Sequence, residues 1–245
     1  MIKTSSLENI LVNFIYILPL LIISGNLLAD MAVVIINIIF LVILKKNNSF
    51  DFIYKNKYFW ILVIFYFYLV LRSVFTLELI SIKSSIFTFR HVLFVFAFYY
   101  LYINKILNLN LLNLILIFVS LFLLIDASYQ YKFDNNIFGY KILHPNRASS
   151  FFGDELIMGS YTFRILALII PLTFFLNANF SKNKTLIKLS LIFFILFFLL
   201  ILSGERLAFF LFLIYFFCII SLFVKKYLNK LFIFFLVISV AIFIL

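Results

Sequence analysis

Apolar segments long enough to cross a bilayer recur along the whole chain and determine its fold class. A transmembrane helix needs about 20 mostly apolar residues. Of the 245 residues, 67% are hydrophobic and only 12% are charged, whereas a soluble domain has roughly half and a quarter. The sequence therefore predicts an all-α integral membrane protein: a polytopic helical bundle of about nine transmembrane helices, the last one truncated, in a single domain over 1–245. The predicted spans are 9–25, 27–44, 58–76, 86–103, 107–125, 157–176, 186–202, 207–224 and 230–245.

The two ends of the chain and its one cysteine add further expectations. The first span follows Lys3 and Glu8 without a small-residue cleavage site, which is typical of an uncleaved signal anchor. The last span stops at Leu245 inside an apolar run, so we expect the protein to be incomplete at its C-terminus. Cys218 lies within an apolar run, and we expect it to be a small buried hydrophobic residue.

The charge distribution predicts a cytoplasmic N-terminus. In that orientation twelve lysines with Glu8 and Asp51 face the cytoplasm, a net +10, and eight cations with seven acids lie outside, a net +1, in agreement with the total of +11. Excess positive charge marks the cytoplasmic side of bacterial membrane proteins. We therefore expect a multi-pass protein of the bacterial inner (plasma) membrane, with a periplasmic loop at 126–156 and a shorter external connection near 76–85. Anionic membrane lipids account for the net basicity, so no nucleic acid partner is expected.

All the arginines fall on the predicted external side, although bacterial topology disfavours positive charge there. A guanidinium group binds phosphate or carboxylate through two parallel hydrogen bonds. The pattern therefore predicts recognition of an anionic, diphosphate-bearing lipid at the outer leaflet. The five arginines are Arg72, Arg90, Arg147, Arg164 and Arg206.

The first candidate segment runs from Arg147 to Arg164. A helix that begins near Ile157 would place Arg164 about 10 Å deep, where an unpaired cation costs about 2–3 kcal/mol. We therefore expect Arg164 to face the bundle interior or a wet cavity. Asp154 and Glu155 are close enough in sequence to neutralise either arginine. A purely structural salt bridge is the alternative interpretation.

The second candidate segment is Ser-Gly-Glu-Arg at 203–206. It interrupts an apolar stretch, 186–224, that would be about 58 Å long as one helix, so the chain must turn there. A turn requires only the serine and the glycine. The charged pair Glu205 and Arg206 is therefore predicted to be functional, as charges within a membrane protein usually are.

The remaining candidates are the two histidines and their neighbours. His144 lies in the long loop and is a candidate proton acceptor, because histidine titrates near neutral pH; a solvated loop histidine is the alternative. Arg90 and His91 open the fourth span, where Arg90 is a supporting candidate. The sequence contains no His, Asp and Glu cluster with ligand spacing and no phosphate-binding glycine loop. We therefore expect no metal and no cofactor, and a donor that is already activated on a lipid.

The segment Arg147-x-Ser-Ser-Phe-Phe-Gly-Asp-Glu-x-Ile-x-Gly-Ser-Tyr, followed by Leu-Ser-Gly-Glu-Arg206, resembles the O-antigen polymerase and O-antigen ligase superfamily over about 140–220. The resemblance implies a glycosyltransferase of polysaccharide or lipopolysaccharide biosynthesis. Such an enzyme moves glycan from undecaprenyl diphosphate to a glycan or lipid A-core acceptor, without nucleotide or metal. It also implies that Arg147, Arg164 and Arg206 contact the diphosphate.

The resemblance has one departure, and other functions compete with it. Members have a later periplasmic loop with another arginine and, in ligases, a histidine base, so we expect this chain to recognise the anion without completing transfer. Polymerase and ligase remain open. A transporter of polysaccharide or lipid-linked glycan would place ionisable residues near the middle of several spans, and these spans are nearly free of charge there. A non-catalytic membrane component would not need five external arginines.

Overall fold

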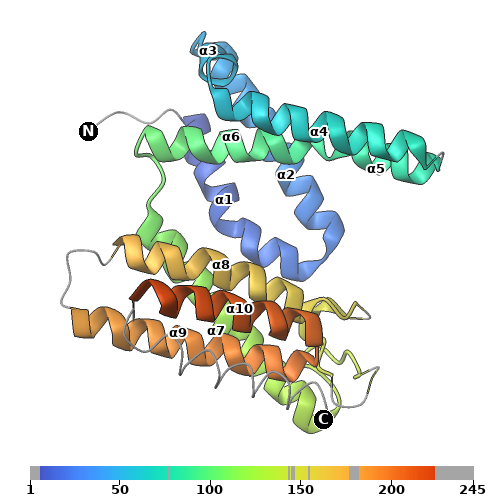
Figure 1. Cartoon of the computed structure of the whole chain (residues 1–245), viewed down its shortest axis with the longest axis vertical. Helices are drawn as coiled ribbons and strands as arrows, with labels where there is room; N and C mark the ends of the chain where they lie inside the picture. The colour runs from blue at the N-terminus through green and yellow to red at the C-terminus, as the bar shows by residue number, and fades with distance from the viewer. Residues whose placement is uncertain are drawn as a thin grey trace. The chain divides into compact units, whose positions relative to one another are not determined.

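The computed structural model describes residues 6–76, 78–142, 144, 147–153, 155–176 and 182–223. Regular structure within these residues is helical, apart from isolated bridges that join Asn135 to Lys141 and His144 to Arg147. The helices, in chain order in Figure 1, are α1 (Ser6–Ser24), α2 (Asn26–Lys46), α3 (Asp51–Tyr54), α4 (Lys57–Phe75), α5 (Leu79–Phe87), α6 (Phe89–Ile103), α7 (Leu109–Phe133), η1 (Ser150–Phe152), α8 (Met158–Leu176), α9 (Lys182–Ser203) and α10 (Arg206–Phe223).

Five helical stretches in the described residues are long and apolar enough to cross a membrane. They are α1, α2, α4, α7 and the pair α5–α6 taken together over Leu79–Ile103. Helices α8, α9 and α10 contain shorter apolar stretches. Several helices of this length and composition indicate a multi-pass membrane protein. The predicted count of nine is not confirmed, and the ninth span, 230–245, lies outside the described residues.

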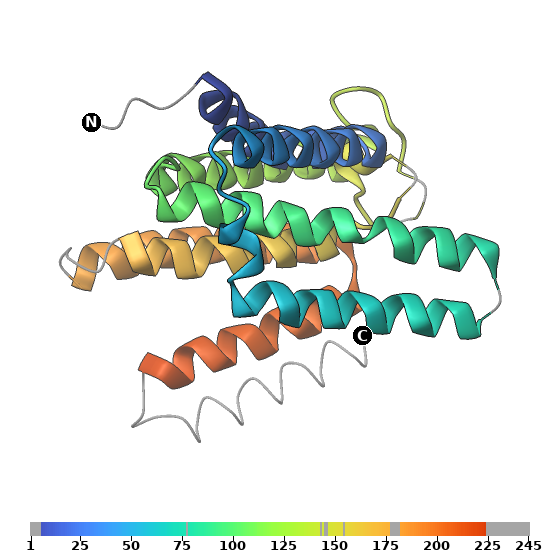
Figure 2. The same cartoon turned by 90° about the horizontal axis from the view of Figure 1, so that it is seen from above.

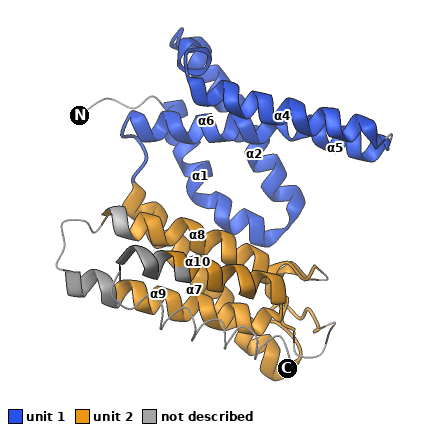
Figure 3. Cartoon of the chain, in the orientation of Figure 1, with its two compact units in different colours: residues 1–108 blue, residues 109–245 orange. Residues whose placement is uncertain are grey.

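The chain divides into two compact units, Met1–Asn108 and Leu109–Leu245, which Figure 3 shows in different colours. The single polytopic domain that the sequence suggested stays a prediction.

Unit 1 is built from antiparallel helix pairs. Helices α1 and α2 pack together, α2 also packs against α6, and α4 packs against α5 and α6, as Figure 2 shows from above. Rings fill the contacts: Phe96 lies edge-on to Phe59 with 5.4 Å between centroids, and Tyr100 lies 5.8 Å from Phe40. The large apolar side chains along α4 are mostly exposed, which is what a lipid-facing helix requires.

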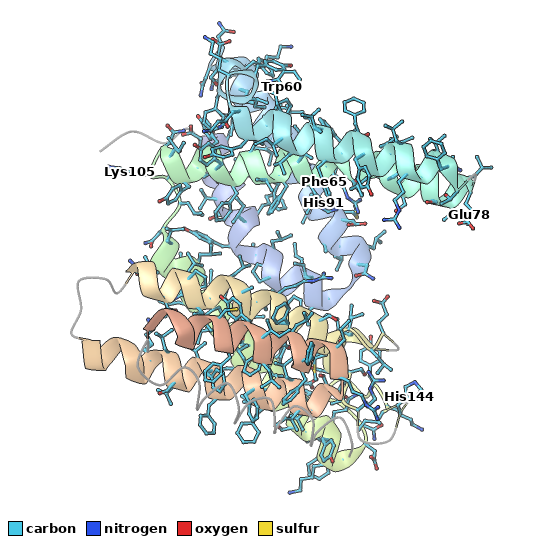
Figure 4. All side chains as sticks on the ribbon, viewed as in Figure 1. Trp60, Phe65, Glu78, His91, Lys105 and His144 are labelled. Carbon is cyan, nitrogen blue, oxygen red and sulfur yellow. The ribbon has the colours of Figure 1, made fainter. Side chains whose placement is uncertain are left out.

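The external connection predicted near 76–85 is wrong in its extent. Helix α4 ends at Phe75 and α5 begins at Leu79, so the turn is short; Glu78 is labelled at this turn in Figure 4. The hydroxyl groups of Ser73 and Ser85 hydrogen bond at 2.6 Å between the two helices. This contact satisfies the hydroxyl of Ser85, which sequence reasoning assigned to the connection, and it lets helix α5 continue through that residue.

Unit 2 contains α7, α8 and α9, which pack against one another, and α10, which packs against α8 and α9. A buried hydrogen bond of 3.1 Å joins Asn113 of α7 to Thr173 of α8. The predicted break at 203–206 is confirmed, because α9 ends at Ser203 and α10 begins at Arg206. The predicted helix start near Ile157 is also confirmed within one residue.

The predicted loop 126–156 begins too early. Helix α7 continues to Phe133, two turns beyond Asp126. Asp126 and Gln130 are spaced by one turn and are fully buried, so the polar residues that suggested a loop form a buried face of the helix. The irregular segment therefore starts at Asp134.

Cysteine labelling tests the orientation that the charge distribution predicts. In a variant without Cys218, a cysteine placed at Asn135 should react with a membrane-impermeant thiol reagent in intact cells, and a cysteine at Asn183 should react only after the cells are opened. The net charge of +10 on one side against +1 on the other sets this expectation. Comparable labelling of both positions in intact cells would contradict a periplasmic loop.

Candidate functional site at one end of unit 2

Three helix ends and the segment between α7 and α8 are joined by hydrogen bonds at one end of unit 2. The ends are the start of α8, the last turn of α9 and the start of α10. Glu205, in the turn between α9 and α10, bonds to the start of α8, and Ala148 bonds to the last turn of α9. This region contains most of the candidate residues selected from the sequence.

Glu205 caps α8 from a different part of the chain. Its two carboxylate oxygens accept hydrogen bonds from the backbone N–H of Gly159 at 2.6 Å and of Ser160 at 3.0 Å, and from the Ser160 hydroxyl at 2.8 Å. These are N–H groups of the first turn, which have no partner inside their own helix. A negative charge there is stabilised by the helix dipole. The Glu205 charge is thus used inside the fold.

Gly159 is required for this close approach. A Cβ at that position would lie 2.6 Å from the Ser203 hydroxyl oxygen and 2.8 Å from Cβ of Glu205. Such distances are shorter than van der Waals contact. The glycine therefore lets the start of α8 pack directly on the α9–α10 turn.

Arg147 lies over the same turn, on the α9 side. Its Nε donates to the Ser203 carbonyl at 3.4 Å, and the N–H of Ala148 donates to the Leu202 carbonyl at 2.8 Å. These carbonyls end α9, where a cation is favoured by the helix dipole. A Cβ on Gly204 would lie 2.7 Å from Cγ of Arg147, so the arginine side chain rests directly on the glycine.

Arg206 is the first residue of α10, and its side chain is exposed. A cation at this end of a helix is repelled by the positive end of the helix dipole. The two ion pairs among the described residues are Lys55–Asp51 and Arg90–Asp30. Within the described part of the chain, Arg147 and Arg206 therefore flank the turn without an acidic partner.

Arg164 differs from expectation, whereas the roles of the two acids near it are not tested. Arg164 is exposed on α8, so the expectation that it faces the bundle interior is wrong; its use of a wet cavity stays a prediction. Glu155 lies just before the start of α8, and its role as the neutralising partner of the arginines stays a prediction. Asp154 lies outside the described residues.

His144 is exposed in the loop, and Figure 4 labels it at that end of unit 2. Its carbonyl accepts from the N–H of Arg147 at 3.2 Å, so the two residues lie on a tight turn. The histidine is thus held beside the candidate arginine. Its role as proton acceptor stays a prediction.

Arg90 belongs to unit 1 and forms an ion pair there. Its Nη2 lies 2.6 Å from Oδ1 of Asp30, and its carbonyl accepts from the Asn37 amide at 2.7 Å. Both contacts join α6 to α2. This arrangement is a structural salt bridge between two helices of unit 1, and the supporting role of Arg90 in anion binding stays a prediction.

A buried polar cluster that sequence reasoning missed holds the loop between α7 and α8. Asp126, Gln130, Asn136 and Ser150 are each at most 2% exposed. The only available signal was the spacing of Asp126 and Gln130 by one helical turn. Their partners are backbone groups of the loop and, for Asp126, also the hydroxyl of Ser150, and no sequence pattern identifies such partners.

Among the described residues, no group of three or more His, Cys, Asp or Glu side chains is arranged to hold a metal ion. The site as described offers guanidinium groups, one exposed imidazole and backbone groups. Chemically, it can bind an anion through charge-assisted hydrogen bonds.

Comparison of the chain with protein-family models, with curated proteins and with solved structures finds no match. The resemblance of residues 140–220 to the O-antigen polymerase and ligase superfamily therefore stays a prediction.

Proposed function

We propose that this protein is a periplasmic-face glycosyltransferase, an O-antigen or polysaccharide polymerase or ligase of the bacterial inner membrane. In this proposal Arg147 and Arg206 bind the diphosphate of an undecaprenyl diphosphate-linked glycan, and Arg164 supports them. The proposal rests on how the charged side chains at the α9–α10 turn are paired. The carboxylate of Glu205 is committed to α8, while Arg147 and Arg206 flank the turn without an acidic partner in the described residues.

The electrostatics of the turn support an anionic ligand. Arg206 and the amide dipoles at the start of α10 are both positive and repel each other. An anion bound beside them would interact favourably with both, and a diphosphate has enough oxygens to reach Arg147 as well. A turn with this charge distribution is more stable with such a ligand than without it.

Glycan transfer then needs charge stabilisation and proton removal. The acceptor hydroxyl oxygen forms a bond to the anomeric carbon, and the bond from that carbon to the diphosphate oxygen breaks. The bonding electrons pass to the leaving diphosphate, whose added charge the guanidinium groups offset. The hydroxyl proton passes to a base, for which His144 is the candidate in this chain.

Binding of lipid diphosphate tests the proposal directly. With the 245-residue chain in nanodiscs, Arg147→Ala and Arg206→Ala should each weaken binding of undecaprenyl diphosphate about tenfold, the equivalent of one charge-assisted hydrogen bond. The corresponding lysine variants should recover only part of the loss, because lysine lacks the planar pair of donors. Undecaprenyl monophosphate should bind more weakly than the diphosphate.

Two controls separate specific recognition from general attraction. Lys141→Ala removes one exposed positive charge from the same loop and should leave binding unchanged. Competition with inorganic pyrophosphate shows whether the lipid tail contributes. If Lys141→Ala weakens binding as much as the arginine variants do, the assignment of Arg147 and Arg206 is wrong.

A further inference from the structure

We propose that the C-terminal end of α7, together with Asn136 just after it, positions Arg147. In this inference Asp126, Gln130 and Asn136 hold Ser150 in a strained conformation and so set the adjacent arginine against the α9–α10 turn. The inference rests on the proposed function in one respect, namely that Arg147 binds a lipid diphosphate. How the loop is held in place does not depend on which ligand Arg147 binds.

Ser150 is the residue on which the three side chains converge. Its φ of 54° lies in the left-handed region, which residues with a Cβ disfavour. Its N–H donates to Oε1 of Gln130 at 2.6 Å, its carbonyl accepts from Nδ2 of Asn136 at 3.1 Å, and its hydroxyl donates to Oδ2 of Asp126. Strain of this kind persists only where the surroundings hold it, and it is concentrated at functional sites.

The same three side chains also bind the earlier part of the loop, at Ile137 and Tyr140. Asp126 accepts from the N–H of Ile137 at 2.9 Å, Gln130 donates to the Tyr140 carbonyl at 3.3 Å, and Asn136 accepts from the N–H of Tyr140 at 2.8 Å. Every side-chain oxygen and nitrogen of the three residues thus has a partner. A fully paired buried network is rigid, so it fixes both the earlier part of the loop and the part around Ser150 relative to α7.

The two residues that follow Arg147 are bound to α9 and to this network. Gln130 accepts from the N–H of Ser149 at 3.0 Å, and Ala148, the next residue back, donates to the Leu202 carbonyl at 2.8 Å. The backbone directly after the arginine is therefore fixed to both α7 and α9. A binding group that is already in place loses less conformational entropy when its ligand arrives, which is the advantage of such a device.

Three variants on α7 test the inference. Gln130→Leu removes the acceptor for Ser149 and Ser150. Asn113→Leu is the matched control, because it makes the same change at a residue of α7 that is 1% exposed and contacts Thr173 instead. Asp126→Asn keeps an oxygen for Ile137 and an amide group for Ser150, and serves as the conservative variant.

The first measurement is hydrogen exchange at the backbone amides of Ala148, Ser149 and Ser150. Their protection should be lost in Gln130→Leu and kept in Asn113→Leu and Asp126→Asn, because exchange requires that these hydrogen bonds open. Retained protection of Ala148 in Gln130→Leu would overturn the positioning role, whatever the ligand of Arg147.

The second measurement is binding of undecaprenyl diphosphate in nanodiscs. Gln130→Leu should weaken it about tenfold, and the other two variants should stay within about twofold of the original chain. In the background of Arg147→Ala, Gln130→Leu should cause no further loss, since residues that act through one another are not additive. Additive losses would overturn the inference, as would unchanged binding in Gln130→Leu once Ala148 exchanges freely. Unchanged binding in Arg147→Ala would instead contradict the proposed function and leave exchange at Ala148 to decide the positioning role.

Discussion

In the protein as the cell makes it, Arg147→Ala and Arg206→Ala should each abolish glycan transfer and leave the amount of protein in the membrane largely intact. The leaving diphosphate gains negative charge as the glycosidic bond breaks, and fixed donors aimed at that charge lower the barrier. Removing one such donor typically slows an enzyme about 100- to 1,000-fold. Lysine at either position should restore transfer poorly, because it lacks the bidentate geometry.

Electrophoresis of the surface glycan and an immunoblot of the protein measure the two quantities together. The Lys141→Ala variant is the control, since it removes an exposed charge from the same loop and should support the original chain-length pattern. A normal glycan pattern in both alanine variants would show that the site assignment is wrong.

Gly204→Ala should reduce binding of undecaprenyl diphosphate about tenfold, as much as Arg147→Ala itself. Gly204 has a φ of 61°, and a Cβ there would lie 2.7 Å from Cγ of Arg147 and 3.3 Å from its Nε. The arginine would have to change its rotamer and give up the Ser203 carbonyl. The left-handed backbone adds a cost of about 1–2 kcal/mol.

Gly153→Ala is a close control for this substitution. Gly153 has a φ of 58°, and a Cβ there would meet nothing within 4 Å. Both variants therefore place a Cβ on backbone with a positive φ, but only Gly204→Ala places it against the arginine. Equal binding by the two variants would show that contact with Gly204 does not set the position of Arg147.

The sequence alone identified most of the helical spans and the turn between α9 and α10. Apolar length predicts a membrane helix directly, because the bilayer imposes its thickness on each segment independently. Gly204 beside Ser203 marks a turn for an equally local reason, and α9 and α10 do end and begin there. The start of α8 followed from the same reasoning.

Sequence reasoning erred where polar residues occur inside helices. It ended the fifth span before Asp126 and read 76–85 as a connection, whereas α7 continues to Phe133 and α5 occupies Leu79–Phe87. A polar residue leaves a membrane helix unless a partner satisfies it. Those partners, such as Ser73 for Ser85, are known only once the helices are packed.

The same distinction between local sequence signals and tertiary contacts applies to the candidate residues. The residue types, the predicted external placement of the arginines and the prediction of an anionic ligand came from the sequence. Only the tertiary structure showed that Glu205 caps α8, that Arg147 lies on Gly204, that Arg164 is exposed and that Arg90 pairs with Asp30. Hydropathy and turn preference act over a few neighbouring residues. The partner of a charge, in contrast, depends on groups tens of residues away, such as Glu205 and Gly159, that meet only when the helices pack.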